Sequence, residues 1–555
     1  MELRDPDRVM RLERMGAAFP TRLSFMRSLV RRMARERWRF EKLRFDVDEN
    51  GFGTSVFAVH TPEWTYSLLI FTHDLPPEKR TDRVIAEAWD ATFNLIDGVP
   101  SDADIERLSQ NTPRQEAGRF TQKELVLARA NRSVRLFEHV VGRLAAGQQP
   151  DIDLVVQVGY LMRTTAVYGN GKFGIADRAR IEDRPEARGS FQIEMLAVYM
   201  FRWFTLELVQ QMARARGGED AAELDPETAR YLGIGNATGL GMAPFLARHP
   251  RLVDRWVVAR ETALARVRAI TSASDASAAL FHSALKQARL HLVDWRVDDV
   301  QQTERITRLK SDLNVIAEIA GMLLPGEPAP WDRLYRIVAL ECSTEGQELL
   351  LSLMLEPHGA LVDDLAEDLA ASEHWQVDGE ATCGETLDLL QSNFAWALAI
   401  DFADPVASEH FWYYSEEKLE PRLGRRIEEP GADREMPLAI ARDVKAFAGA
   451  LQAEDPDTPL GALLVRQPEH LFAAQRVQLS ELHPYAEIRD NLIARGIRPI
   501  DILRFKLALF GASRFDPKSD LWTRISMYQG APLPGSLDGP GVEGWSLSAR
   551  PGAAA

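Results

Sequence analysis

The chain has 555 residues, of which 45% are hydrophobic and 27% charged, and its net charge is −16. One hydrophobic core rarely serves so long a chain, so we expect at least two domains, and this composition excludes wholesale disorder. A chain of negative net charge repels phosphate backbones, so nucleic acid is not an expected partner. The two cysteines, Cys342 and Cys383, are too few for a disulfide framework.

The sequence contains no apolar run of the roughly 18 residues that a membrane-spanning helix needs, and residues 1–16 lack the apolar core of a secretory signal. We therefore expect no membrane partner and a cytoplasmic location. A basic stretch follows at 27–44 and includes Arg31, Arg32 and Arg35. We interpret it as a solvated helix face that leads into a strand, because most charge runs are of this kind.

The segment 36–75 contains three β-rich runs, which are FEKLRFDVDE, GTSVFAVHT and WTYSLLIFTH. Turn signals at Asn50-Gly51 and Thr61-Pro62 separate them, so the segment predicts a three-stranded antiparallel meander as the one sizeable sheet. The next segment, Asp82–Ile96, has apolar residues at helical spacing and predicts a helix that stops at Gly98.

From residue 121 onward the pattern is helical. Thr121 with Glu124 matches a capping box and predicts a helix to Leu144. Further helices are predicted at 191–216, 278–292, 302–323 and 347–355. The predicted fold class is therefore mainly α, a multi-lobed helical protein with a small antiparallel α+β N-terminal lobe.

The domain boundaries follow from these patterns. We expect an α+β lobe at 1–120, a helical domain with two glycine-rich loops at 121–325, a second helical domain at 331–530 and a Pro/Gly-rich tail or arm at 531–555. The tail would lie on its own body or on a neighbour, with Trp545 as its anchor. We expect a homodimer, because such a tail gains order most simply across another subunit.

The first candidate site is the loop around Gly169, Gly171 and Gly174. Glycines let the backbone approach an anion closely, and in this loop Lys172 would supply charge, Tyr168 a proton and Asn170 a substrate contact. A tight turn between helices with solvent-facing polar groups is the alternative.

The second candidate site is the segment 231–245, with four glycines in nine residues and with Asn236 and Thr238 as substrate-binding candidates. Its spacing is only superficially that of a dinucleotide loop, because a polar helix-like stretch precedes it rather than a buried strand. We expect a glycine-rich helix start whose amides favour a carboxylate or phosphate; close helix packing is the alternative.

The third candidate site is a predicted helix at 404–422. On it His410, Tyr414 and Lys418 fall four residues apart on one face. Tyr414 and Lys418 would act as acid and base, His410 would bind substrate and Arg422 would hold a carboxylate. An ordinary exposed face with Glu–Lys pairs is the alternative.

Taken together, these residues suggest an enzyme of small-molecule metabolism that performs metal-independent, lyase- or isomerase-like acid–base chemistry on a small anionic, carboxylate-bearing substrate. No cofactor is favoured and no metal site is expected, because the Glu-His neighbours in the sequence diverge by about 100° on a helix. Two alternatives stay open, a flavin- or nucleotide-dependent oxidoreductase and a non-catalytic helical scaffold or regulatory subunit.

Overall fold

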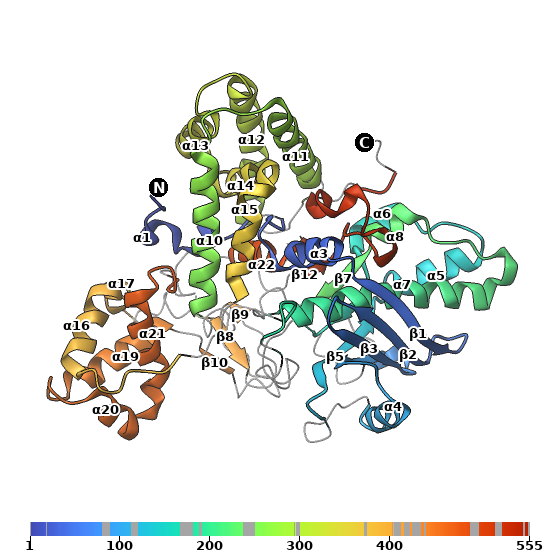
Figure 1. Ribbon diagram of the computed structural model, residues 1–555, viewed down its shortest axis with the longest axis horizontal. Coiled ribbons are helices and arrows are strands. Elements are labelled where there is room, and N and C mark those ends of the chain that lie inside the picture. Colours follow the sequence, from blue (N-terminus) through green and yellow to red (C-terminus); the bar gives the residue numbers. More distant parts are fainter. Residues whose placement is uncertain are drawn as a thin grey trace.

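The structure is a computed structural model of the whole chain (Figure 1). It describes residues 2–17, 19–79, 89–112, 120–166, 181, 183–187, 191–236, 250–293, 295, 300–370, 375–401, 403, 412–415, 422–423, 435–437, 440–488, 499–516, 524–547 and 550–552.

A nine-stranded mixed sheet dominates one side of the molecule, at the right of Figure 1. Its order is β1-β2-β3-β4-β5-β6-β7-β12-β11, and all neighbours are antiparallel except β6 and β7, which are parallel. The strands are β1 (Arg39–Val47), β2 (Gly53–His60), β3 (Thr65–Thr72), β4 (Ala91–Asp97), β5 (Glu124–Arg132), β6 (Tyr160–Thr164), β7 (Gly233–Asn236), β11 (Ala512–Asp516) and β12 (Arg524–Met527).

The predicted fold class is wrong, because the protein is a mixed α/β structure with a large curled sheet. The three predicted strands do form as β1, β2 and β3, but they are only one edge of that sheet. Residues 91–97 form strand β4 where a helix was predicted. Six of its seven residues are buried, and a run buried on both faces shows no alternation that would mark it as a strand.

The helix predicted from Thr121 to Leu144 is also wrong over its first half. Thr121 and Glu124 do meet, since the Thr121 hydroxyl donates to Glu124 Oε2 over 2.9 Å. The pair closes a turn that leads into strand β5, and the helix α5 (Phe137–Ala145) begins only afterwards. The same side-chain pair therefore satisfies turn amides here, which Ser and Thr do in turns as well as at helix starts.

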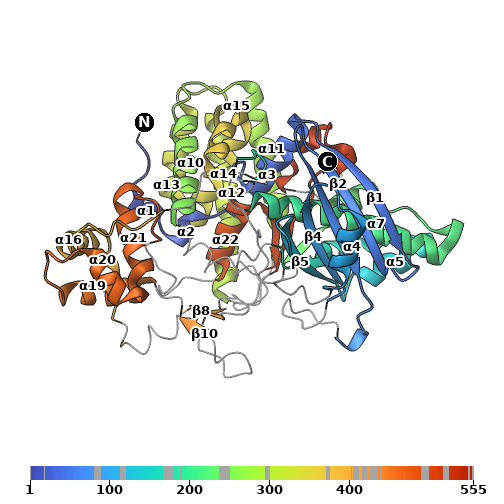
Figure 2. The same ribbon diagram turned by 60° about the horizontal axis from the view of Figure 1, so that its bottom comes forward.

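Both faces of the sheet are covered, as Figure 2 shows from below. The long helix α7 (Gln192–Gly217) packs on one face, where Phe93 stacks on Phe201 with ring centroids 4.3 Å apart. The short helix α4 (Asp102–Ser109) covers the other, where Leu108 joins Ile96 in a small apolar cluster. This double coverage explains why the central strands are apolar throughout.

The helical part of the molecule lies above and to the left of the sheet in Figure 1. Three of its helices lie within three residues of their predicted bounds: α11 (Asp275–Val293), α12 (Val300–Leu323) and α14 (Thr344–Leu355). The same holds for α7 on the sheet. The other helices of this part are α10 (Pro250–Arg268), α13 (Pro330–Glu341), α15 (Gly359–Val362), α16 (Cys383–Asn393), α17 (Ala395–Leu398), α19 (Ile440–Gln452), α20 (Leu460–Arg466), α21 (Leu471–Leu482) and α22 (Pro499–Phe510). No helix among the described residues combines the length and the apolar character that a membrane span needs.

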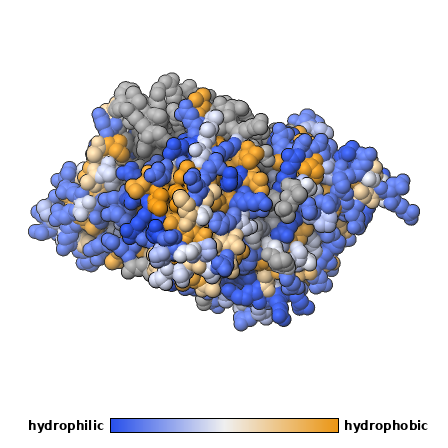
Figure 3. Space-filling view, turned by 90° about the horizontal axis from the view of Figure 1, so that it is seen from above, coloured by the Kyte–Doolittle hydropathy of each residue, from blue (hydrophilic) through white to orange (hydrophobic). Residues whose placement is uncertain are grey.

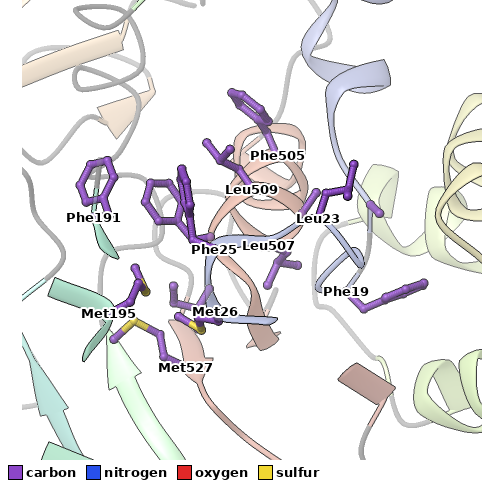
Figure 4. Close-up of a cluster of buried hydrophobic side chains, with 14 of the residues drawn as sticks. Phe19, Leu23, Phe25, Met26, Phe191, Met195, Phe505, Leu507, Leu509 and Met527 are labelled. Atoms are coloured by element: carbon purple, nitrogen blue, oxygen red, sulfur yellow. The ribbon is translucent and has the colours of Figure 1, made fainter. Parts of the chain in front are cut away.

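An aromatic seam joins the sheet to the helical part (Figure 4). Phe25 is the first residue of helix α3 (Phe25–Arg35). The centroid of its ring lies 6.5 Å from that of Phe191 and 5.8 Å from that of Phe510. Phe191 immediately precedes α7, and Phe510 ends α22. The start of α3 is therefore held between two segments that are far away in the sequence.

The C-terminal segment lies on its own chain. Trp545 is 2% exposed and stacks on Tyr528 at 6.4 Å. Arg202 donates hydrogen bonds to the carbonyl oxygens of Ala531 and Leu232, and Arg230 donates to those of Gly530 and Gly541. Since these contacts order the segment within one molecule, it supplies no argument for a second subunit.

Candidate functional site

Most residues of the predicted sites lie outside the described residues. The structure gives no position for six of them, which are Tyr168, Asn170, Lys172, Thr238, His410 and Lys418.

The helix predicted for 404–422 is wrong where the structure describes that segment. Residues Trp412–Ser415 form strand β8 of a second, three-stranded sheet with order β10-β8-β9. Tyr414 is paired with Met436 of β10 (Glu435–Pro437), and Arg422 belongs to β9 (Arg422–Leu423), where it is paired with Tyr413. A strand alternates its side chains between faces, so the argument from helical spacing no longer applies to Tyr414.

The second glycine-rich segment begins as a buried strand. Asn236 is the last residue of β7, is fully buried and is paired with Ile525 of β12. A Cβ atom added to Gly233 would lie 2.5 Å from the carbonyl oxygen of Met527, and one added to Gly235 would lie 2.7 Å from the ring of Tyr160. These two glycines are therefore explained by close packing inside the sheet rather than by contact with a ligand.

Replacing Gly235 by alanine is expected to destabilise the fold by roughly 2 kcal/mol, because the added methyl group overpacks the buried Tyr160 ring. Gly142→Ala in α5 is the matched control, since nothing lies within 4 Å of its added Cβ atom and alanine favours a helix by about 0.5–1 kcal/mol. Urea unfolding of the two variants would measure the difference. An equal effect of both substitutions would contradict this explanation of β7.

A pocket of about 220 Å³ lies where α3, the start of α7 and the 3-10 helix η4 (Asp363–Ala370) meet. We call it the arginine pocket. Helix α3 contributes Phe25, Ser28, Leu29, Arg31, Arg32 and Arg35 to its wall. Other segments contribute Pro185, Gln192, Asp363, Ala366, Glu367, Leu369 and Glu543.

Ion pairs hold two acidic residues of the pocket wall, Asp363 and Glu543, and others lie nearby. Arg22 donates two hydrogen bonds to the carboxylate of Asp363, from Nε at 2.6 Å and from Nη2 at 2.7 Å. Its Nη2 also lies 2.9 Å from Glu543 Oε2. Arg27 makes the equivalent two-bond contact with Glu356, at 2.6 and 2.8 Å. Two-bond contacts of this kind have one geometry, so they hold α3 and the residues just before it against residues 356–363, and Arg22 and Arg27 also contact Glu543 of the C-terminal segment.

Arg31 stands in the middle of this wall with an incomplete set of partners. Its Nη2 donates to the carbonyl oxygen of Arg22 at 2.7 Å and lies 3.5 Å from Asp363. Its Nη1 is buried, and none of the described residues accepts a hydrogen bond from it. The hydroxyl of Ser28, one turn earlier, is likewise buried without a partner in the described part of the chain. Both residues line the arginine pocket, so its wall contains two buried polar atoms that have no partner among the described residues.

The charge of Arg31 increases the free-energy cost of its missing hydrogen bond. Burial lowers the pKa of Arg31 to about 10, with Arg27 and Arg22 adding repulsion and Asp363 opposing it. At neutral pH the side chain is therefore still protonated, although it is only 11% exposed. A buried cation with an unpaired donor is costly, and an anion placed against it offsets that cost.

The start of α7 adds to this electrostatic environment. Gln192, the first residue of the helix, lines the arginine pocket, and no side chain caps that end of the helix. The preceding Phe191 has a left-handed backbone with φ of 71°, which turns the chain sharply into the helix. The N-terminus of a long helix carries a partial positive charge, so it too favours an anionic group.

The sequence does not reveal this pocket, although Arg31, Arg32 and Arg35 belong to the basic stretch 27–44. The arginines were interpreted as a solvated face, yet only Arg35 is well exposed, at 62%. Arg32 instead donates to the carbonyl oxygen of Pro185. The available signal was the density of apolar residues in the same helix, since a helix that buries both faces must bury some of its charges.

One other group stands out among the described residues. Lys506 of α22 is 1% exposed, and no described residue forms a hydrogen bond with its Nζ. Burial lowers the pKa of Lys506 to about 7. No cluster of His, Cys, Asp or Glu suited to a metal ion occurs in the part of the chain that the structure describes.

Comparison with known proteins gives no relative for this fold or site. The chain matches no protein-family model, no curated protein sequence and no solved structure.

Proposed function

We propose that the protein binds a small anionic, carboxylate-bearing molecule in the arginine pocket. The observation that carries this proposal is the buried, charged Arg31, whose Nη1 has no acceptor among the described residues. The Ser28 hydroxyl and the start of α7 support it from the same wall. Carboxylates suit such a site, because a guanidinium and a hydroxyl can bind the two oxygens of one carboxylate.

The proposal predicts that Arg31→Gln weakens anion binding by about one to two decades, because a charge-assisted hydrogen bond contributes roughly 1.5–3 kcal/mol. The probes are acetate, 4-methylpentanoate, malate and inorganic phosphate, each titrated while the melting temperature of the full chain is recorded. At least one carboxylate should raise the melting temperature of the unaltered protein, and Arg31→Gln should need a far higher concentration for the same rise.

Arg336→Gln is the matched control, because Arg336 of α13 is 72% exposed and, among the described residues, forms an ion pair only with Asp332 of its own helix. It removes the same charge from the chain and should leave every titration unchanged. A shift that survives in Arg31→Gln would place the anion elsewhere. The absence of any shift in the unaltered protein would end the proposal.

Catalysis on the bound molecule remains our proposal from the sequence alone. The lyase- or isomerase-like acid–base chemistry assigned to Tyr168, Lys172 and Lys418 depends on residues outside the described ranges. The same holds for the flavin- or nucleotide-dependent alternative, and an absorbance spectrum of the purified protein would reveal a tightly bound flavin.

A non-catalytic scaffold is the other alternative. Large apolar side chains are exposed on α11 and α13, among them Leu290, Val293 and Leu340. Figure 3 shows apolar residues gathered near the middle of the face seen from above, with hydrophilic residues around them. A pure scaffold has no need of buried ionisable groups with shifted pKa values, whereas burial lowers the pKa of both Arg31 and Lys506. Ligand binding is therefore the better-supported proposal.

The homodimer and the cytoplasmic location also remain predictions. The homodimer was expected because the C-terminal segment would become ordered on a second subunit, but that segment packs on its own chain.

A further inference from the structure

We infer that the ligand of the arginine pocket is a zwitterion, a free amino acid with an apolar side chain. This inference depends on the proposed function, because it assigns the rest of the molecule whose carboxylate meets Arg31. It comes from the composition of the remaining wall, which supplies negative charge and apolar surface in addition to the arginines.

The wall carries as many carboxylates as guanidinium groups. Arg31, Arg32 and Arg35 line it together with Asp363, Glu367 and Glu543. A ligand with only a negative charge would be attracted by the three arginines and repelled by the three carboxylates. A molecule with one negative and one positive group interacts favourably with both sets.

The three acidic side chains differ in how many of their carboxylate oxygens already have a partner. Asp363 is already gripped by Arg22 through both oxygens. Glu367 uses only Oε1, toward Arg35 at 3.4 Å, and Glu543 uses Oε2, toward Arg22 at 2.9 Å. Within the described residues, nothing donates a hydrogen bond to the second oxygen of either glutamate. These two oxygens can accept hydrogen bonds from an ammonium group.

The apolar residues of the wall indicate what lies between the two charged groups. Phe25, Leu29 and Leu369 line the pocket and are almost fully buried. The pocket has a volume of about 220 Å³, which suits one small molecule. A free amino acid with an aliphatic or aromatic side chain fits these three demands together.

The test compares amino acids with the same molecules lacking one charge. Isothermal titration of the full chain uses leucine with 4-methylpentanoate and 3-methylbutylamine, and phenylalanine with 3-phenylpropanoate. We expect at least one amino acid to bind ten-fold or more tightly than its deaminated partner, and 3-methylbutylamine not to bind measurably.

Variants assign the two charged contacts. Glu367→Gln should weaken binding of the amino acid about ten-fold and leave that of its deaminated partner unchanged or slightly stronger, whereas Arg31→Gln should weaken both. Glu367 is 58% exposed, so the variant should fold. Glu318→Gln on α12 is the control for the loss of a negative charge outside the pocket.

The two proposals fail in different ways. If deaminated acids bind as tightly as the amino acids and Glu367→Gln changes nothing, the zwitterion is excluded while anion binding at Arg31 stands. If no amino acid, carboxylic acid or inorganic phosphate binds, both proposals are overturned.

Discussion

Replacing Lys506 by methionine is expected to stabilise the folded protein at pH 7 by about 4 kcal/mol. The side chain is buried and has no partner among the described residues, and burial lowers the pKa of Lys506 to about 7. In the unfolded chain its pKa is about 10.4. Each unit of difference is worth about 1.4 kcal/mol, and methionine fills the same space without any ionisable group.

The sign of the pH dependence follows from proton binding. Between pH 7 and about 10 the unfolded chain holds the proton of Lys506 and the folded chain does not, so stability gained from this group rises with pH. The difference in unfolding free energy between Lys506→Met and the unaltered protein should therefore be largest at pH 7 and below and should shrink toward pH 10. Urea unfolding at pH 6, 7.5 and 9 measures it.

Lys286→Met on the exposed side of α11 is the control and should change stability by less than about 0.5 kcal/mol at every pH. A destabilised Lys506→Met variant, or a difference that is constant with pH, would show that Lys506 is charged and paired in the folded protein.

Replacing Arg4 by methionine is expected to destabilise the protein by about 3 kcal/mol. Arg4 Nε lies 2.7 Å from Glu261 Oε2 and its Nη1 lies 2.9 Å from Glu348 Oε1, and both carboxylates are fully buried. Removing one partner of a buried ion pair typically costs about 3–5 kcal/mol, because a buried charge is left behind. Arg260 still contacts both glutamates, at 3.1 and 3.5 Å, so we expect the lower end of this range.

Acid sensitivity provides the second measurement for Arg4. Burial alone would raise the pKa of Glu348, but Arg4 and Arg260 outweigh it and lower that pKa. A carboxyl group whose pKa is lowered by folding stabilises the folded state at every pH above its unfolded pKa, which is near 4.3. This stabilisation is lost as the pH falls toward the pKa of the folded state. Arg4→Met should therefore unfold at a higher pH during acid titration. Arg336→Met, on the exposed face of α13, should leave the acid midpoint where it is.

The sequence predicts those parts of the fold in which one local rule acts alone. The hairpin turn at Asn50-Gly51 and the runs beside it identify β1 to β3, and the helix α7 follows from its apolar content and length. Strand β4 was missed because α7 and α4 bury both of its faces, which removes the alternating pattern. Strand β7 was missed because glycine disfavours strands, and Gly235 is explained only by the side chains of Tyr160 and Arg163, which pack closely against it in the fold.

The arginine pocket could be predicted only in part. That α3 is basic is plain from Arg31, Arg32 and Arg35, but whether a basic helix faces solvent depends on what packs against it. Here η4 and the residues around Glu543 bury it, and these segments come from distant parts of the chain. No spacing rule connects such segments, so the unpaired Nη1 of Arg31 emerges only from the folded structure.

The way the C-terminal segment closes over α3 bears on how the protein is made. Arg22 and Arg27 leave the ribosome long before their partners Asp363 and Glu356, and Glu543 follows later still. Strand β7 likewise waits for β12 as its neighbour. The basic helix is therefore made long before the acidic partners of its arginines, and a chain cut short before residue 543 lacks one residue of the pocket wall. A ligand added to a translation reaction would be retained only by chains that have been synthesised past residue 543.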